Sequence, residues 1–193
     1  MFEIWGDTSN LKGDKLIRLN KYLTNTENHK NIVFFPPSYP LWKDYLKKVD
    51  VAVLTFKYFT YQNSPYVTLS MLNDALNDFV EFKDKILVAI SPMGFDYNLD
   101  KEINIPITNN RATLKANVKG AKVYYSEEIG APYFTYSAPD THLIWFENTL
   151  SIATKHNLIK KYGYRGIYYE HPEGFFEGNW EALYEIYEKR NSL

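Results

Sequence analysis

The stretch that decides the fold runs from His142 to Trp180 and reads HLIWFENTLSIATKHNLIKKYGYRGIYYEHPEGFFEGNW. Ile152, His156 and Ile159 recur at helical spacing, and Gly163 stands where the C-cap of that helix is expected. The apolar run that follows predicts a buried strand, and a polar turn and a second helix come after it. Because α/β folds place their chemistry at the carboxyl ends of parallel strands, the residues just past this strand are candidate site residues.

Composition excludes several classes of function. The chain has 193 residues, a formal net charge of −1 and no cysteine. The near-zero charge, with lysines and glutamates interspersed, predicts no nucleic-acid partner, and the missing cysteines exclude disulfides and thiolate metal sites. No apolar run approaches the roughly 18 residues of a membrane span, so no membrane partner is expected. The four histidines show no ligand spacing, and we predict neither a metal nor a cofactor.

Aromatic residues are unusually frequent, at 17% of the chain with 17 tyrosines. Ordinary use of amphipathic rings in a core accounts for such a composition. A surface that stacks on sugar rings accounts for it as well. Composition alone leaves both interpretations open.

Strands and helices alternate along most of the chain. The apolar runs predict strands at residues 31–35, 51–56 and 85–90, and the end of another at residues 1–5. Leucine spacing predicts helices at residues 15–23, 41–48 and 68–82. Uniformly apolar strands separated by helices indicate a parallel sheet that is covered on both faces. The fold class is therefore α/β.

Residues 95–140 break this pattern. They are polar, β-branched and rich in turns, with Asn109-Asn110 and Lys119-Gly120 as examples, and predict a small antiparallel insertion within a single domain of residues 1–193. A closed (β/α)8 barrel takes about 250 residues, so the remainder is enough for about half a barrel. No glycine-rich phosphate turn follows any strand, which argues against a nucleotide site.

Several segments together resemble the C-terminal half of a glycoside hydrolase family 18 domain, in the chitinase-like branch of bacterial spore-cortex and LysM-associated enzymes. They are NIVFFPPS at residues 31–38, KILVAISPMGFDY at 85–97, GAPYFTYSAPDTHLIWFEN at 130–148 and GNW at 178–180. The resemblance covers nearly the whole chain in matching order. It implies a partial (β/α)8 barrel formed by about the last four βα units, with the insertion before the last helix–strand–helix.

The resemblance also implies candidate site residues. In this family a glutamate at the end of the fourth strand is the general acid, the substrate's own acetamide is the nucleophile, and preceding aspartates orient it. Glu3 matches that glutamate, but the aspartates are absent from this sequence. Phe56 and Lys57 stand where the family has a Tyr-Asp pair. Met93 stands where the family frequently has a tyrosine, and Glu170 replaces the tryptophan that lies beneath the bound sugar. Beside these positions, Tyr58 and Tyr169 complete the candidate substrate contacts.

Each candidate has a structural interpretation as well. Glu170 and Glu173 could act as acid and base, although two exposed loop carboxylates are the simpler expectation. We expect Trp145 and Trp180 to anchor the core and His156 to lie in a helix interface. Lys57 at a strand end needs solvent or a carboxylate, and Glu3 or Glu170 would serve.

The sequence thus predicts a non-catalytic module with a family 18-like fold, acting in glycan recognition or as a structural part of a cell-wall, spore or phage system. The alternative is a fragment or complementing half of an N-acetylglucosamine-specific hydrolase acting on peptidoglycan or chitin, with Glu3 as general acid. The expected ligand is a glycan that contains N-acetylglucosamine. A half-barrel exposes strand edges and an apolar interior, so we also expect self-association or a partner chain that completes the barrel.

Overall fold

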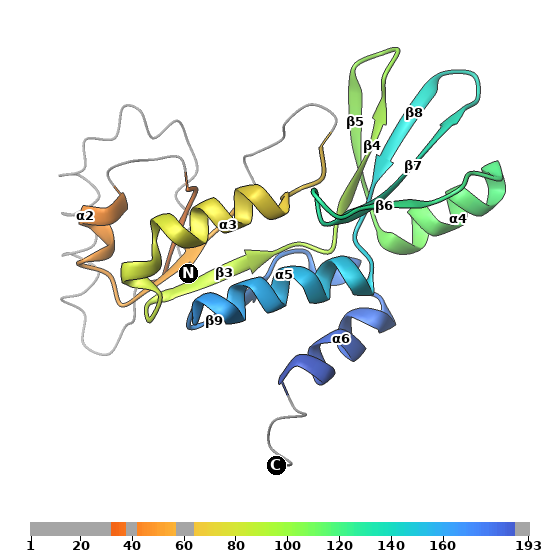
Figure 1. The fold of residues 1–193 in the computed structure, drawn as a ribbon. Helices are drawn as coiled ribbons and strands as arrows, with labels where there is room; N and C mark the ends of the chain where they lie inside the picture. Colours follow the sequence, from red (N-terminus) through yellow and green to blue (C-terminus); the bar gives the residue numbers. More distant parts are fainter. Residues whose placement is uncertain (1–31, 38–41, 57–63, 188–193) are drawn as a thin grey trace.

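The computed structural model describes residues 32–37, 42–56 and 64–187, with the side chains of 185–187 excepted. The chain forms a parallel sheet and an antiparallel sheet that projects from one end of it (Figure 1). Helices connect the strands along the chain and pack beside the two sheets. The expected strand end at residues 1–5 and helix at residues 15–23 lie outside the described residues.

The parallel sheet has the strand order β1-β2-β3-β9. All three pairings are parallel, and the register aligns Phe35 with Leu54, Leu54 with Val88, and Ile90 with Tyr169. These strands confirm the predicted ones to within two residues at each end. Their bounds are Ile32–Phe35 for β1, Val51–Leu54 for β2, Ile86–Ile90 for β3 and Gly166–Tyr169 for β9.

The helices begin and end at residues that cap them. Thr68 accepts a hydrogen bond from the amide of Met71 at the start of α3, and Asn148 forms a capping box with Ser151 at the start of α5. Gly163 ends α5 with φ of 73°, a left-handed conformation that favours glycine, as predicted. The bounds are Trp42–Leu46 for α2, Leu69–Asp78 for α3, Thr149–Tyr162 for α5 and Glu177–Tyr187 for α6; a 3₁₀ turn, η2 at Val80–Phe82, continues α3, and a second, η3, spans Pro172–Gly174.

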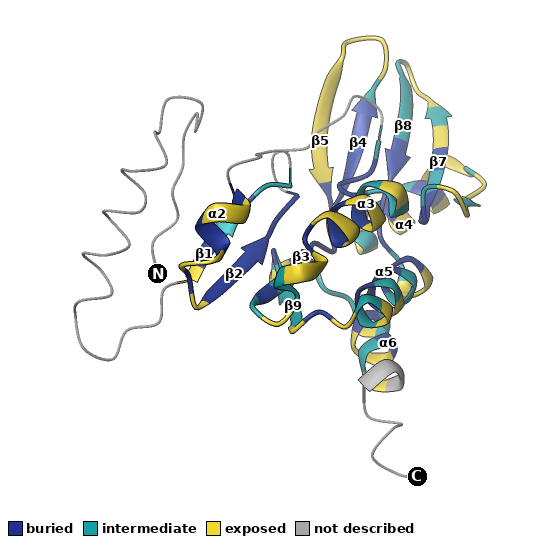
Figure 2. Cartoon of the chain, turned by 60° about the vertical axis from the view of Figure 1, so that its left-hand side comes forward, coloured by how far each residue is buried: buried dark blue, intermediate teal, exposed yellow. Residues whose placement is uncertain are grey.

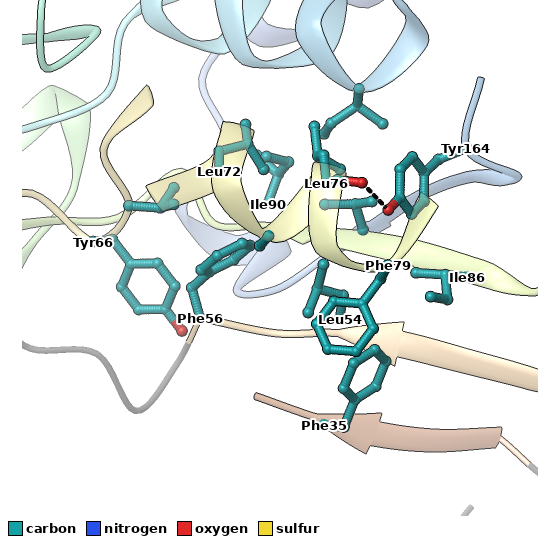
Figure 3. Close-up of a cluster of buried hydrophobic side chains, with 14 of the residues drawn as sticks. Phe35, Leu54, Phe56, Tyr66, Leu72, Leu76, Phe79, Ile86, Ile90 and Tyr164 are labelled. Atoms are coloured by element: carbon teal, nitrogen blue, oxygen red, sulfur yellow. Dashed lines mark hydrogen bonds between the residues drawn. The ribbon is translucent and has the colours of Figure 1, made fainter. Parts of the chain in front are cut away.

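The main core lies between the parallel sheet and helices α2, α3 and α5 (Figure 3). The Tyr164 hydroxyl donates to the carbonyl oxygen of Leu76 at 2.6 Å, and burial raises the pKa of this tyrosine. On the opposite face of the sheet, Phe34 and Tyr168 are half-buried and meet edge to face at 5.1 Å. The strongly buried residues of the core include Phe35, Leu54, Phe56, Leu72, Leu76, Phe79, Ile86 and Ile90.

The second sheet is antiparallel, with the order β5-β4-β8-β7-β6. It occupies the region of the predicted insertion, and its outer strand β5 is largely exposed (Figure 2). Its strands are Gly94–Asn98 (β4), Ile103–Ile107 (β5), Tyr124–Ser126 (β6), Ala131–Ser137 (β7) and Thr141–Trp145 (β8).

Helix α4, at Asn109–Lys119, was not predicted, and the turn expected at Asn109-Asn110 is wrong. Thr108 caps the helix by accepting from the amide of Arg111. Only Ala112 and Ala116 are buried, against Phe134 and the rest of a small second core. Two alanines on an otherwise polar helix give almost no apolar periodicity, which explains why the sequence pattern missed it.

Gly94 joins the two sheets. A Cβ atom at this position would lie 2.1 Å from the carbonyl oxygen of Trp145 and 2.5 Å from the Cα of Phe146. Glycine therefore allows the start of β4, shortly after β3 ends, to lie close to the end of its antiparallel neighbour β8. This close approach sets the antiparallel sheet beside the carboxyl end of the parallel one.

Candidate functional site

The candidate site lies at the carboxyl edge of the parallel sheet. Thr55 and Phe56 follow β2, Ser91 and Met93 follow β3, and Glu170 follows β9. Since parallel strands end at one edge, the fold brings these positions together. This edge is where the sequence placed the candidate residues.

Glu170 is the central polar residue of this edge, and it is only 9% exposed. Thr55 donates its hydroxyl to one carboxylate oxygen at 2.6 Å, and Tyr66 donates to the other at 2.8 Å. The backbone amide of Glu170 donates to the carbonyl oxygen of Ile90 at 2.9 Å. The expectation of an exposed loop carboxylate is therefore wrong for Glu170. A buried carboxylate needs such donors, and segments distant in sequence supply them.

The antiparallel sheet holds Tyr66 in position. The Tyr66 ring stacks on Phe95 of β4, with centroids 6.2 Å apart and an interplanar angle of 13°. Tyr97, also on β4, donates its hydroxyl to the carbonyl oxygen of Ser64 at 2.7 Å, and burial raises the pKa of Tyr97. The insertion thereby orients a donor toward the carboxyl edge.

Two of the candidate substrate contacts lie on the core side of the sheet. Phe56 is 1% exposed and packs among the residues of the main core. The hydroxyl of Tyr169 lies 3.0 Å from Nε2 of His156, and its ring meets Phe175 edge to face at 4.7 Å. A sugar contact through Phe56 would require this ring to leave the core, whereas Tyr169 is half-buried.

Met93 is half-buried beneath the turn that follows β9. Its amide donates to the Ser91 hydroxyl at 3.2 Å, and a Cβ atom at Gly174 would lie 2.8 Å from its sulfur. In the same turn, Nδ1 of His171 lies 3.1 Å from the carboxylate of Glu173. The backbone amide of Glu173 and then His171 lower the pKa of that exposed carboxyl. Glu170 and Glu173 therefore have separate partners, and an acid–base pair between them stays a prediction.

Three candidate residues, Glu3, Lys57 and Tyr58, lie outside the described residues. Their roles as general acid and substrate contacts stay predictions, as does an ion pair of Lys57 with a carboxylate. The hydrogen bonds from Thr55 and Tyr66 satisfy Glu170 without such a pair.

The remaining aromatic predictions have mixed outcomes. Trp145 is buried against Tyr133, with ring centroids 4.7 Å apart, as expected of a core anchor. His156 is fully buried between α5 and β9, which confirms its place in an interface. The prediction for Trp180 is wrong, because its side chain is 57% exposed on α6. The helical spacing of an aromatic residue does not show whether another element packs against that face of the helix.

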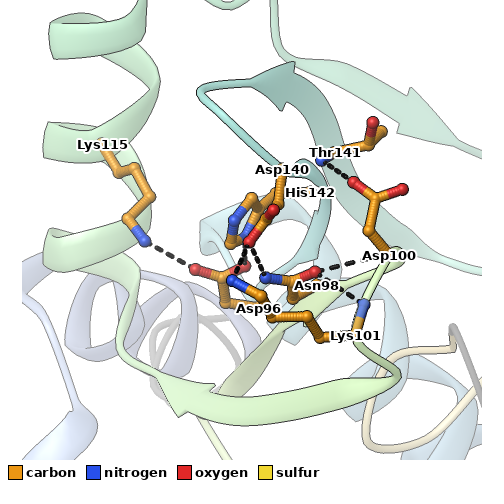
Figure 4. A network of polar contacts seen from close by, with 8 residues as sticks. All are labelled: Asp96, Asn98, Asp100, Lys101, Lys115, Asp140, Thr141 and His142. Carbon is orange, nitrogen blue, oxygen red and sulfur yellow. Dashed lines mark hydrogen bonds and ion pairs between the residues drawn. The ribbon is translucent and has the colours of Figure 1, made fainter.

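A polar network on the antiparallel sheet was not found by sequence reasoning (Figure 4). Buried Asp96 on β4 accepts from Lys115 of α4 at 2.6 Å and lies 2.7 Å from Nδ1 of His142 on β8. The His142 ring stacks on Tyr136 with centroids 4.6 Å apart. The alternation of β4 shows only that Asp96 faces inward, and its partners depend on the helix that the sequence missed.

A second unpredicted pair joins the antiparallel sheet to α5. Glu147 and Lys155 are both buried and form an ion pair. Burial raises the pKa of Glu147, which Lys155 opposes. Asn109 donates to the backbone carbonyl of Glu147 at 2.7 Å and so ties the start of α4 to the same point.

Within the described part of the chain, no group of three or more histidine, aspartate or glutamate side chains could hold a metal ion. Within the same residues, no helix combines the length and apolarity that a membrane crossing requires. Neither finding adds a site to the carboxyl edge.

The chain is similar in sequence to curated enzymes of bacterial spores. It is 28% identical to the cortical fragment-lytic enzyme of Bacillus subtilis over 147 residues, which cover 70% of this chain and 34% of that enzyme. The Bacillus anthracis enzyme of the same name is 34% identical over 107 residues, which cover 52% and 25%. The chain thus matches about a quarter to a third of the length of these relatives. No family model matches it.

Solved structures show the fold. The spore cortex-lytic enzyme SleL of Bacillus cereus matches with a TM-score of 0.77 and 22% identity, over 89% of this chain and 46% of that one. A chitinase of Chromobacterium violaceum matches with a TM-score of 0.74 and 21% identity, over 86% and 57%. These findings confirm the resemblance predicted from the sequence and the partial barrel. The chain is similar in sequence to cortical fragment-lytic enzymes, and its fold is part of a chitinase-like (β/α)8 barrel.

Proposed function

We propose that this chain is a non-catalytic module that recognises glycans containing N-acetylglucosamine in a bacterial cell-wall, spore or phage setting. Similarity to cortical fragment-lytic enzymes over 70% of the chain supports the ligand class. The carboxyl edge of the sheet, where such folds bind their substrates, supplies the site.

The observation that carries the non-catalytic proposal is the state of Glu170. Both of its oxygens accept hydrogen bonds from hydroxyl groups of the protein, Thr55 and Tyr66. This arrangement does not suit Glu170 as the acid of a Glu170–Glu173 pair, because a general acid must direct a proton toward the leaving oxygen of a substrate. Glu3, the general acid of the hydrolase alternative, lies outside the described residues. Glu170 therefore acts here by holding Thr55 and Tyr66 in place beneath the ligand.

The experiment measures binding and turnover separately. N-acetylglucosamine oligomers are titrated into the protein by calorimetry, and fluorophore release from chitobiose and chitotriose glycosides is followed in parallel. The proposal predicts binding without release, and equal binding by the Glu3→Gln variant. We expect Glu170→Gln to weaken binding, because the amide nitrogen replaces one of the two accepting oxygens and cannot accept from a hydroxyl. Glu173→Gln, at an exposed carboxylate, is the matched control.

Turnover that Glu3→Gln abolishes would overturn the non-catalytic proposal in favour of the hydrolase alternative. In that alternative the chain is a fragment or complementing half of an N-acetylglucosamine-specific glycosidase, with Glu3 as general acid. This alternative takes its activity from the curated relatives, which are named as lytic enzymes. Absence of both binding and turnover would overturn glycan recognition itself.

A further inference from the structure

We propose that a cavity between the end of α4 and strand β7 binds a sugar that carries a carboxylate group. This inference rests on the proposed function, because it assigns a second, charge-selective contact to the same class of ligand. The cavity measures about 350 Å³. Helix α4 and strand β7, which flank it, lie apart from the carboxyl edge of the parallel sheet (Figure 1). The side chains that define it are Lys119, Lys122, Tyr124, Thr135, Tyr136 and Ser137.

Two lysines bring uncompensated positive charge to this cavity. The Lys119 ammonium lies 5.4 Å from the centroid of the Tyr136 ring, and that of Lys122 lies 5.2 Å from the centroid of Tyr124. Across residues 32–37, 42–56 and 64–187, neither lysine has a carboxylate partner. A ring face orients an ammonium group without neutralising it. Both cations are therefore available to an anion.

The end of α4 does not require these lysines. Gly120, with φ of 60°, donates its amide to the carbonyl oxygen of Asn117 at 3.1 Å, and the amide of Ala121 donates to that of Ala116 at 2.9 Å. Backbone amides thus satisfy two of the last four carbonyl oxygens of the helix, those of Ala116 and Asn117. A Cβ atom at Gly120 would have no atom within 4 Å, which leaves this side of the turn open.

Lys115 provides an internal contrast. It lies one helical turn before Lys119, 5.6 Å from the same Tyr136 ring, but its ammonium donates to Asp96 at 2.6 Å. That carboxylate neutralises Lys115. Lys119, one turn later on α4, has no carboxylate partner among the described residues. The charge of the cavity therefore comes from Lys119 and Lys122.

The other lining groups suit a sugar better than a simple ion. Tyr124 is 48% exposed and offers apolar ring surface beside the Lys122 ammonium. Thr135 and Ser137 also line the cavity, and a hydroxyl group can both donate and accept. A sugar ring with hydroxyl groups and one carboxylate matches apolar aromatic surface, two hydroxyls and two ammonium groups.

The experiment compares two sugars that share one ring, N-acetylmuramic acid with a carboxylate and N-acetylglucosamine without one. Each is titrated into the whole chain by calorimetry, with inorganic phosphate as a probe of charge alone. We expect tighter binding of the carboxylated sugar, and a loss of about tenfold in its affinity on Lys119→Met or Lys122→Met. Lys161→Met is the matched control, because Lys161 lies in the last turn of α5, which also ends at a left-handed glycine.

Equal affinity for both sugars, or unchanged affinity in both lysine variants, would overturn the inference. Binding of phosphate as tight as that of the carboxylated sugar would overturn the sugar assignment. The circular dichroism spectrum of each variant checks that it is folded. Binding of neutral N-acetylglucosamine oligomers at the carboxyl edge should be unchanged by the lysine variants, so a failure here is distinguishable from a failure of the proposed function.

Discussion

At the scale of single residues, Glu170 is a candidate site residue and also a structural residue that links separate segments of the fold. The resemblance places it where the family has a tryptophan under the sugar, and the structure buries it between the hydroxyl of Thr55, just after β2, and that of Tyr66. A buried carboxylate with two donors ties three segments of the chain to each other. Its role could not be predicted from sequence, because Thr55 lies 115 residues away and Tyr66 lies 104 away.

His156 leads to a prediction about pH. Burial lowers the pKa of His156 to about 4, from an ordinary value of 6.5. Between these values the unfolded chain binds a proton that the folded chain does not, so stability is complete above pH 6.5 and falls as the pH drops toward 4. A difference of about 2.5 in pKa corresponds to a loss of about 3 kcal/mol. Urea denaturation at several pH values measures it.

The variant His156→Gln should flatten this dependence, because it removes the group that titrates. The exposed His171 is the control, and His171→Gln should keep the slope of the parent chain. A slope that survives in His156→Gln would show that another group is responsible.

At the scale of elements, prediction succeeded where a helix or strand carries its own signals. Asn148 and Gly163 bracket α5, and the apolar run of β9 was predicted with the bounds that the structure has. Helix α4 was missed because its contact with the sheet consists of two alanines. Small side chains pack a helix closely without giving it an apolar stripe, so the signal for α4 exists only in its caps.

The close approach of β4 and β8 at Gly94 gives a prediction at this scale. Replacing Gly94 with alanine would set a methyl group 2.1 Å from the backbone oxygen of Trp145, and backbone cannot move aside as a side chain can. We expect a loss of more than about 2 kcal/mol in the free energy of unfolding. Gly166→Ala is the matched control, since Gly166 also opens a strand and its nearest neighbour is a flexible leucine side chain at 3.3 Å. An equal free energy of unfolding for the two variants would contradict the close contact of Gly94 with the backbone of Trp145.

At the scale of the whole molecule, the described parallel sheet is open on both sides. Strands β1 and β9 are its outer strands, and α6, next to β9 along the chain, exposes Trp180 and Tyr184, the latter 59% exposed. Unpaired edges and exposed aromatic rings favour association with another polypeptide. Part of a barrel thus presents the surfaces that the rest of a barrel would cover.

We therefore expect self-association at micromolar concentration, measured by sedimentation equilibrium. Trp180→Lys should weaken it, because the charge would be buried in the contact. Val118→Lys, at an exposed apolar residue on α4 of the antiparallel sheet, should leave it unchanged. A single species of 22.7 kDa in the parent chain would contradict this expectation.

The sequence by itself determined the alternation of strands and helices, the parallel sheet, the place of the insertion and the resemblance to a chitinase-like barrel. Those features follow from periodicity, caps and ordered motifs, which are local in the chain. Only the tertiary structure decided that Glu170 is buried and hydrogen-bonded, that Trp180 is exposed, and that Lys119 and Lys122 share a cavity with two tyrosines. Burial and polar partnership depend on contacts between distant segments: the segment from His142 to Trp180 contains Glu170 but neither Thr55 nor Tyr66.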